Sequence, residues 1–370
     1  MVVGQTYAFR VDASVEIGSG HVMRCLTLAD ALMVQGAAAC FFITRPHTGH
    51  MDAVITARGY SVVSLDLPDA VTDYGAHPAP PAHAHWLGGD WPGDAAQTAR
   101  ALHDVDAGWL IMDHYALDAT WQDIGVCGQT RLYVLDDLAD RPHLADGLMD
   151  HVAGRQAADY DPLVSSVCVR HVGLEFALLR PEFAALRSQA LARRDTDRVA
   201  RILVTMGGVD KDNITGAVLD ALAQVQDIAG IAVDVVMGVT APHLACVCAQ
   251  AAAMPFDVTV HVAIMDMAQK MVEADLAIGA IGATSWERFC LGLPTVSVAI
   301  AENQKPLANT LARQTLTYLL PPDDLKVWVS TFQDVLADGP GRKAMGLRCA
   351  QHVDGGGAPR VAQYLTQTPS

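Results

Sequence analysis

Two widely separated parts of this chain begin in the same way: an apolar strand runs into a glycine turn, and a helix follows. The strands are expected at 7–11 and 201–206, the turns at Gly18-Ser19-Gly20 and Gly207-Gly208, and the helices at 22–36 and 214–225. Apolar residues recur at helical spacing in both helices. Such a unit is typical of a parallel sheet covered by helices, so its restart predicts an α/β protein of two Rossmann-like domains.

Further apolar segments alternate with helical or loop sequence in both halves. Strands are expected at 40–44, 61–65, 109–112, 131–135, 166–169, 232–237, 258–262, 274–278 and 295–299. Charged residues gather in 181–198, where we place the joint between the domains. The predicted boundaries are therefore 1–185 and 198–340, with a helical tail at 341–370, and the Pro-, His- and Gly-rich tract 75–92 is expected to be a long surface loop.

The composition of the chain argues against several classes of function. The 25 Lys and Arg residues against 41 Asp and Glu give a net charge of −16, which argues against nucleic-acid or anionic-membrane binding. Apolar runs stay shorter than the roughly 18–20 residues of a spanning helix, and the N-terminus lacks a charged leader, so a cytoplasmic protein with reduced cysteines is expected. The histidines of the 75–92 tract lack the flanking carboxylates or regular spacing of a metal site, so we predict no metal and no cofactor.

The turn Gly18-Ser19-Gly20-His21 lies where open α/β sheets bind ligands, at the carboxyl end of a strand. Gly18 and Gly20 allow a substrate to approach the backbone. His21 falls at a helix start, where the dipole favours a neutral imidazole that can take a proton from water. Arg24 opposes the same dipole, and an anionic ligand would offset that cost. A solvated cap histidine and an exposed arginine are the alternatives.

Polar residues also follow two later strands, as Asp113-His114-Tyr115 and Asp136-Asp137. They can bind a polar substrate or orient a water molecule, although acidic residues after strands are also ordinary turn and cap residues. Because parallel strands end at the same edge of a sheet, these side chains are expected to face the same cleft as the first glycine turn.

The second half offers two places for a phosphate group. Gly207-Gly208, with Asn213 soon afterwards, can present backbone amides, although turn geometry explains the glycines equally well. A helix is expected to begin around Thr284, where Thr284 and Glu287 fit a capping box. The same helix start can bind a diphosphate, with Glu287 placed to bind ribose hydroxyls.

Six motifs occur in the order and spacing of the nucleotide-sugar hydrolases of the pseudaminic acid pathway, and the chain resembles this family from about residue 7 to residue 320. The motifs are Gly18-Ser19-Gly20-His21, Asp113-His114-Tyr115, Leu179-Arg180-Pro181-Glu182-Phe183, Met206-Gly207-Gly208-Val209-Asp210, Thr284-Ser285-Trp286-Glu287 and Glu302-Asn303-Gln304. The resemblance implies a GT-B-type arrangement of the two domains with a cleft between them. It also implies hydrolysis of a UDP-linked 2,4-diacetamido-2,4,6-trideoxyhexose, by water attack at the anomeric carbon with inversion and without a divalent metal.

Carried over to this chain, the resemblance gives His21 the activation of water and Tyr115 the placement of the water or the sugar, with Asp113 as the third catalytic residue. The remaining residues would bind substrate: Gly18, Gly20 and Arg24 on the N-terminal side, Gly207, Gly208, Thr284, Ser285 and Glu287 around UDP, and Asn303 reaching the substrate from the UDP side. The 75–92 tract and the tail after Asp338 are longer than the family pattern, which leaves the exact sugar open.

Two other functions remain open. A GT-B glycosyltransferase would pass the sugar to an acceptor, but it usually presents an apolar or basic membrane-facing patch, which the net charge of −16 disfavours. A non-catalytic nucleotide-sugar-binding protein would explain the glycines and Glu287 but gives no reason for His21. The expected partner is the UDP-linked sugar alone, bound by a monomer.

Overall fold

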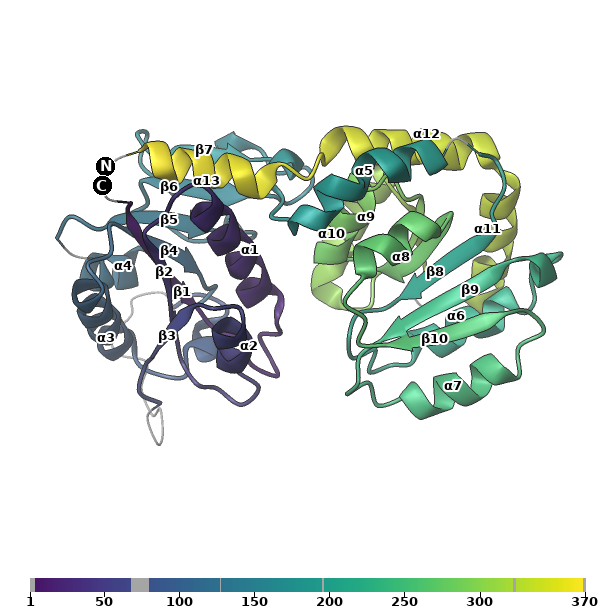
Figure 1. Ribbon diagram of the computed structural model, residues 1–370, viewed down its shortest axis with the longest axis horizontal. Coiled ribbons are helices and arrows are strands. Elements are labelled where there is room, and N and C mark those ends of the chain that lie inside the picture. The colour runs from purple at the N-terminus through teal and green to yellow at the C-terminus, as the bar shows by residue number, and fades with distance from the viewer. Residues whose placement is uncertain (1–3, 68–79, 127, 195, 322–323, 369–370) are drawn as a thin grey trace. The chain divides into compact units, whose positions relative to one another are not determined.

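The computed structural model describes residues 4–67, 80–126, 128–194, 196–321 and 324–368, and within them the chain divides into two compact units. The first unit combines Met1–Leu178 with Gly356–Ser370, and the second is Leu179–Gly355. Each unit is built on a parallel sheet with helices on both faces (Figure 1). The predicted fold class, two Rossmann-like α/β domains, is confirmed.

The first sheet has the strand order β3-β2-β1-β4-β5-β6-β7. Its strands are β1 Thr6–Val11, β2 Ala39–Thr44, β3 Ser61–Ser64, β4 Trp109–Asp113, β5 Arg131–Leu135, β6 Gly147–Asp150 and β7 Val169–Val172. The helices are α1 Gly20–Val34, α2 Asp52–Ala57, α3 Trp91–Asp104, α4 Ala119–Gly125 and α13 Gly357–Gln367, with 3-10 turns η1 Ala84–Leu87, η2 Ala157–Tyr160 and η3 Leu174–Phe176. Helices α1, α2 and α13 cover one face, and α3 and α4 cover the other (Figure 1).

The second sheet has the order β10-β9-β8-β11-β12-β13. Its strands are β8 Arg201–Thr205, β9 Ala232–Met237, β10 Val258–Val262, β11 Leu276–Ala280, β12 Thr295–Val298 and β13 Tyr318–Leu320. The helices are α5 Pro181–Arg193, α6 Ile214–Leu222, α7 Leu244–Ala252, α8 Met267–Glu273, α9 Ala283–Cys290, α10 Lys305–Arg313, α11 Leu325–Ala337 and α12 Gly339–His352, with 3-10 turns η4 Ile228–Gly230 and η5 Glu302–Gln304.

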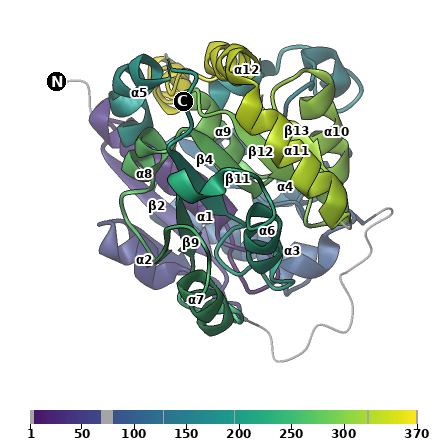
Figure 2. The same cartoon turned by 90° about the vertical axis from the view of Figure 1, so that its right-hand side faces the viewer.

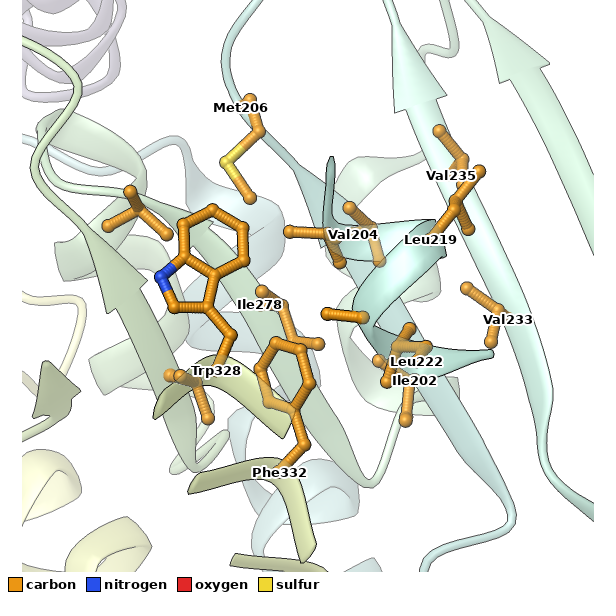
Figure 3. Close-up of a cluster of buried hydrophobic side chains, with 14 of the residues drawn as sticks. Ile202, Val204, Met206, Leu219, Leu222, Val233, Val235, Ile278, Trp328 and Phe332 are labelled. Atoms are coloured by element: carbon orange, nitrogen blue, oxygen red, sulfur yellow. The ribbon is translucent and has the colours of Figure 1, made fainter. Parts of the chain in front are cut away.

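The core of the second unit lies between its sheet and the helices α6 and α11, which pack side by side (Figure 2). The rings of Trp328 and Phe332 on α11 lie against Val204 and Ile278 of the sheet (Figure 3). Both aromatic side chains are buried, and the indole Nε1 of Trp328 donates to the carbonyl of Pro321 at 2.6 Å. Truncating a buried aromatic residue to alanine typically costs about 3–5 kcal/mol, so α11 is integral to this unit.

The structure differs from the sequence expectations at four elements. The strand expected at 166–169 is wrong: Ser166 and Val167 lie in a turn, and β7 begins at Val169. The sequence analysis also missed β6 and β13, which are short. The charged joint expected at 181–198 is largely the helix α5, which packs within the second unit, where Arg187 donates to the backbone carbonyls of Cys290 and Ala350.

The C-terminal segment does not form a separate tail. Helix α12 belongs to the second unit, whereas α13 returns to the first unit and packs on α1 (Figure 1). Val361 and Leu365 of α13 are fully buried there, and the hydroxyl of Tyr7 in β1 donates to the Leu365 carbonyl at 3.3 Å. The apolar face of α13 is thus part of the first core. Of the tract 75–92, residues 75–79 lie outside the described residues, and the remainder contains η1 and the start of α3.

Candidate active site

His21 and Asp113 meet where the strand order of the first sheet reverses. β1 and β4 are neighbours in the sheet although α1, β2, α2, β3 and α3 separate them in the chain. Val11 pairs with Asp113 in this register, so the loop after β1 and the end of β4 lie together at the carboxyl edge. Ligands of open α/β sheets bind at this kind of switch point. Here His21, in the first turn of α1, places its Nδ1 2.6 Å from Oδ1 of Asp113.

The contact fixes which nitrogen of His21 faces outward. Burial acts to raise the pKa of Asp113, but the charges of Arg24 and His21 outweigh it and hold this pKa below its usual value. The carboxylate can only accept a hydrogen bond, so Nδ1 of His21 carries a proton, and in the neutral imidazole the lone pair lies on Nε2. Within the described residues Nε2 has no hydrogen-bond partner, and the side chain is 12% exposed. This nitrogen is therefore available to accept a proton.

Arg24 is committed to carboxylates of the protein itself. Its Nε and Nη2 donate to Oδ2 and Oδ1 of Asp113 at 2.6 and 2.7 Å, and its Nη1 donates to Oδ2 of Asp137 at 2.6 Å. The sequence analysis left open whether this cation binds a ligand anion or is merely exposed, and the structure pairs it with two aspartates of the protein. A bidentate guanidinium holds a carboxylate in one orientation. Arg24 thus positions Asp113 behind His21.

Tyr115 packs its ring against His21 and directs its hydroxyl inward. The two rings are perpendicular, with centroids 4.7 Å apart, and the hydroxyl donates to Oδ2 of Asp137 at 2.5 Å. Burial, with the charge of Asp137, raises the pKa of Tyr115, so the phenol stays protonated. Burial opposes ionisation of Asp137, but Arg24 and His151 lower its pKa to about 2. Asp137 is a residue of this group that the sequence analysis left as a possible turn residue.

The glycine turn before α1 leaves space beside His21. Gly18 has φ +81°, which favours glycine, and its amide donates to the Ser14 carbonyl at 2.9 Å. A Cβ added at Gly18 or Gly20 would meet no described atom within 4 Å. Both glycines therefore leave the backbone accessible, as the sequence analysis expected of a turn approached by a ligand.

His114 belongs to a buried ionic network rather than to this group. Its Nε2 lies 3.1 Å from Oδ2 of Asp12, which pairs with Arg10 at 2.7 Å. Arg10 also pairs with Asp94 at 2.9 Å, and Arg45 pairs with the same Asp94 at 2.7 Å. Removing one partner of a buried pair typically costs about 3–5 kcal/mol, so the network fixes the ends of β1 and β2.

In the second unit, the predicted capping box at Thr284 and Glu287 is wrong. Helix α9 begins one residue earlier, at Ala283, with Gly282 as its N-cap, and Ser285 at the third helical position is the residue that contacts the N-cap. The Gly282 amide donates to Oγ of Ser285 at 3.3 Å, and the Ser285 amide donates to the Gly282 carbonyl at 2.9 Å. The side chain of Ser285 is thus buried and used to shape the loop, which leaves Thr284 and Glu287 without a capping role.

A buried cation underlies the start of α9. Nη2 of Arg288 donates to the Ala280 carbonyl at 2.8 Å and to Oγ of Ser285 at 3.1 Å, and its guanidinium lies so close to Gly279 that a Cβ there would clash. Burial lowers the pKa of Arg288 to about 10, so it stays charged at neutral pH. Within the described residues, its Nε and Nη1 have no hydrogen-bond partner. The positive charge adds to that of the helix terminus.

Glu287 lies one turn into α9, with its side chain 16% exposed. Burial raises the pKa of Glu287, and Arg180, whose Nη2 lies 3.4 Å from Oε1 of Glu287, opposes that shift. The sequence analysis gave Arg180 no role, although it stands in one of the family motifs. The ion pair holds the Glu287 carboxylate in place while leaving part of it open to solvent.

The turn after β8 leads into helix α6, whose first amides are capped by a side chain of the turn. Gly207 has φ +86°, and a Cβ at Gly207 or Gly208 would meet no described atom within 4 Å. Asp210 accepts from the amides of Ile214 and Thr215 at 2.9 Å each, so it caps α6 from within the protein. The amides of Ile214 and Thr215 are therefore bound by the protein itself, and the phosphate contact of Gly207-Gly208 stays a prediction. The glycines themselves remain open at the edge that they share with α9, since β8 and β11 are neighbours.

One further predicted site residue, and the searches for metal sites and membrane spans, complete the description of the site. Asn303 lies in η5, and its side chain lies outside the described part of the structure. Among the described residues, no group of three or more His, Cys, Asp or Glu side chains is arranged to hold a metal ion. Over the same residues, no helix combines the length and apolar character needed to cross a bilayer.

The two parallel-sheet α/β domains of this protein have the fold of the GT-B glycosyltransferases. MurG of Acinetobacter baumannii superposes with a TM-score of 0.71 at 16% identity, covering 99% of this chain and 100% of that one. The calicheamicin glycosyltransferase CalG4 superposes with a TM-score of 0.64, also at 16% identity, covering 98% and 97% of the two chains. At these identities the likeness concerns the fold.

Sequence comparison gives nearer relatives. The spore coat polysaccharide biosynthesis protein SpsG of Bacillus subtilis (strain 168) is 31% identical over 199 residues, 52% of this chain and 57% of SpsG. UDP-2,4-diacetamido-2,4,6-trideoxy-beta-L-altropyranose hydrolase of Campylobacter jejuni is 24% identical over 208 residues, 56% of this chain and 62% of the hydrolase. The chain thus spans less than two thirds of either relative. No family model matches. The resemblance to the hydrolase family, inferred from the motifs, is confirmed as a distant relationship.

Proposed function

We propose that this protein is a nucleotide-sugar hydrolase that releases UDP from UDP-2,4-diacetamido-2,4,6-trideoxy-β-L-altropyranose. The observation that carries the proposal is the pair formed by His21 and Asp113 at the switch point of the first sheet. A relative with the same named activity supports the substrate. An imidazole whose Nδ1 is held by a carboxylate, with Nε2 unpartnered among the described residues, is the arrangement that a general base requires.

In the proposed reaction, Nε2 of His21 takes a proton from water while the water oxygen attacks the anomeric carbon. The bond from that carbon to the diphosphate oxygen breaks, and UDP leaves with the electron pair, so the anomeric configuration inverts. Asp113 remains ionised and stabilises the imidazolium that forms, because its pKa is held low. Arg24 keeps Asp113 in the orientation that this step needs.

The second unit is proposed to bind the departing UDP. The amides at the start of α9 and the buried charge of Arg288 would stabilise the diphosphate, as donors aimed at developing negative charge do. Glu287 would accept hydrogen bonds from the ribose hydroxyls. Gly207 and Gly208 would allow the nucleotide to approach the backbone, since neither carries a side chain in its way.

The test is incubation with a panel of UDP- and CMP-linked diacetamido sugars without an acceptor, in buffer containing EDTA, followed by mass spectrometry. The proposal predicts UDP and the free sugar from the altro-configured UDP substrate, with turnover unaffected by EDTA. Turnover that appears only when an acceptor sugar is added would show a glycosyltransferase. UDP-sugar binding without turnover under either condition would show a binding protein.

A further inference from the structure

An aromatic cluster stands beside His21, and the reaction proposed above does not use it. It is formed by His83, Trp86 and Tyr115, with Trp86 on the 3-10 turn η1. Trp86 stacks on Tyr115 with ring centroids 5.7 Å apart and an interplanar angle of 23°. The ring centroid of His83 lies 4.4 Å from that of Trp86 and 5.6 Å from that of Tyr115, and the centroids of Trp86 and His21 are 6.3 Å apart, with the two rings at 74°.

The segment that carries this cluster is fixed to the body of the first unit. Leu87 is fully buried in the core formed with α3 and α4. Gly88 has φ +64°, and a Cβ there would clash with the His47 ring, so only glycine suits this turn. Gly89 packs on the guanidinium of Arg45, which is itself paired with Asp94. The rings therefore form a fixed wall.

The wall is made of aromatic ring surface, with the ring of His83 tilted by 41° to that of Trp86. Trp86 and His83 are each partly exposed, and the ring of Tyr115 is held from another side by Arg141, 5.7 Å from its centroid. Burial, with the nearby His85, lowers the pKa of His83, so its ring is neutral at neutral pH. Aromatic faces of this kind favour C–H and methyl groups over hydroxyls, because hydroxyls would lose water without gaining a hydrogen bond.

We propose that Trp86 and His83 form a specificity wall that packs on the apolar side of the sugar, its C6 methyl and acetamido methyl groups, while His21 faces the anomeric carbon. The inference rests on the proposed function and adds the residues that select a 6-deoxy, acetamido-substituted hexose over a 6-hydroxy one. The ring of Tyr115 packs against both His21, the proposed base, and Trp86 of the wall. Tyr115 thus orients the wall relative to the base.

The experiment compares wild type, Trp86→Ala, Trp86→Phe and His85→Ala. We expect Trp86→Ala to lower kcat/KM for the trideoxy substrate roughly 10- to 100-fold, mainly through KM, as the loss of an apolar contact of this size does. The same variant should change kcat/KM for UDP-N-acetylglucosamine much less. Trp86→Phe should recover most of the difference, since it keeps an aromatic face. His85 lies on the same turn but is exposed and paired with Glu16, so His85→Ala is the matched control.

A second readout separates the wall from the reaction. Saturation-transfer NMR with the free 2,4-diacetamido-2,4,6-trideoxyhexose should show transfer to its methyl groups in wild type and His85→Ala, and loss of that transfer in Trp86→Ala. Unchanged transfer in Trp86→Ala, or equal losses of kcat/KM for the 6-deoxy and 6-hydroxy substrates, would overturn the wall. Methyl transfer through Trp86 in a protein that fails to release UDP would keep the wall and reject the hydrolase.

Discussion

Nδ1 of His21 lies 2.6 Å from Oδ1 of Asp113, although 92 positions separate the two residues in the chain. The sheet brings them together, because β1 and β4 are neighbours and both end at the same edge. Asp113 is fully buried and bound by Arg24, whereas His21 keeps one nitrogen toward solvent. This pair is the centre of the proposed chemistry, and the first two predictions concern it.

Replacing His21 by Asn should abolish most hydrolysis and leave UDP affinity unchanged within about two-fold. The variant loses the group that takes the proton from water, and loss of a general base typically lowers a rate by about 10²–10⁴-fold. Initial rates of UDP release and calorimetric titration with UDP measure the two effects. His85→Asn, at an exposed histidine of the same unit, should behave as wild type. A His21→Asn variant with most of its turnover would remove His21 from the mechanism.

Replacing Asp113 by Asn should also lower kcat by about 10²-fold or more, with KM little changed. The new amide can donate to Nδ1 of His21, which would move the imidazole proton to Nε2 and block the base. The change also leaves Arg24 with a buried charge partly unpaired, so the first unit should lose about 3–5 kcal/mol of stability. Urea unfolding reports the stability loss. Asp137→Asn keeps the contact of His21 with Asp113 and should reduce kcat less; an equal or larger loss would contradict the assigned roles.

Replacing Arg288 by Met should weaken UDP binding by up to about 10-fold, because its buried charge adds to the positive start of α9, an effect of up to about 2 kcal/mol in partly buried geometries. The loss should shrink at high salt, because part of the interaction is electrostatic. Calorimetry with UDP and with uridine distinguishes a diphosphate contact from a general loss of fold. The affinity for uridine should be nearly the same in wild type and in Arg288→Met. Arg313→Met, at an exposed arginine of α10, is the control, and equal UDP affinity in all three proteins would contradict the proposed role.

Burial, with the charge of Arg141, lowers the pKa of His143 from 6.5 to about 4, and its Nδ1 accepts from Nε2 of Gln122 at 2.8 Å. The unfolded chain takes up this proton as pH falls below about 6.5, whereas the folded chain does so only near 4. Stability should therefore fall between these values, by up to about 3 kcal/mol from this group. In His143→Asn that part of the pH dependence should disappear. Urea unfolding from pH 8 to pH 4.5 measures it, with His103→Asn as an exposed control. Parallel curves for wild type and His143→Asn would refute the prediction.

Replacing Leu365 by Ala should destabilise the first unit by about 2–5 kcal/mol, because the side chain is fully buried against the first core. Hydrogen exchange should rise in β1 and α1 and stay unchanged in β8 and α11, which belong to the second unit. Gln363→Ala, at an exposed position of the same helix, is the control. Increased exchange confined to the second unit would show that α13 packs elsewhere in solution.

Much of the fold could be predicted because its signals are local. Apolar segments identified most strands, and a following glycine turn marked β1 and β8, while the four-residue β6, which begins with Gly147, gave too short a pattern. The end of the chain was harder. The amphipathic pattern of α13 predicts a helix but does not say which core it covers, and only long-range contacts such as Tyr7 with Leu365 decide that.

The sequence predicted which residues lie near the site better than it predicted what each of them contacts. His21 and Asp113 could be placed at one sheet edge, but the contact between them depends on which strands are neighbours. Arg24 looked free because its two carboxylate partners are distant in the chain. At α9, the sequence predicted Thr284 as the N-cap, whereas the helix begins after Gly282, whose amide donates to Oγ of Ser285.

The central claim is that His21 directs water to the anomeric carbon, and the origin of the new oxygen tests it most directly. Wild-type protein is incubated with UDP-2,4-diacetamido-2,4,6-trideoxy-β-L-altropyranose in ¹⁸O-labelled water without an acceptor. The masses of both products are then measured by mass spectrometry at early times. The account predicts one ¹⁸O atom in the sugar and none in UDP, at a rate that falls by about 10²–10⁴-fold in His21→Asn. Label in UDP would mean attack on phosphorus and would contradict the account.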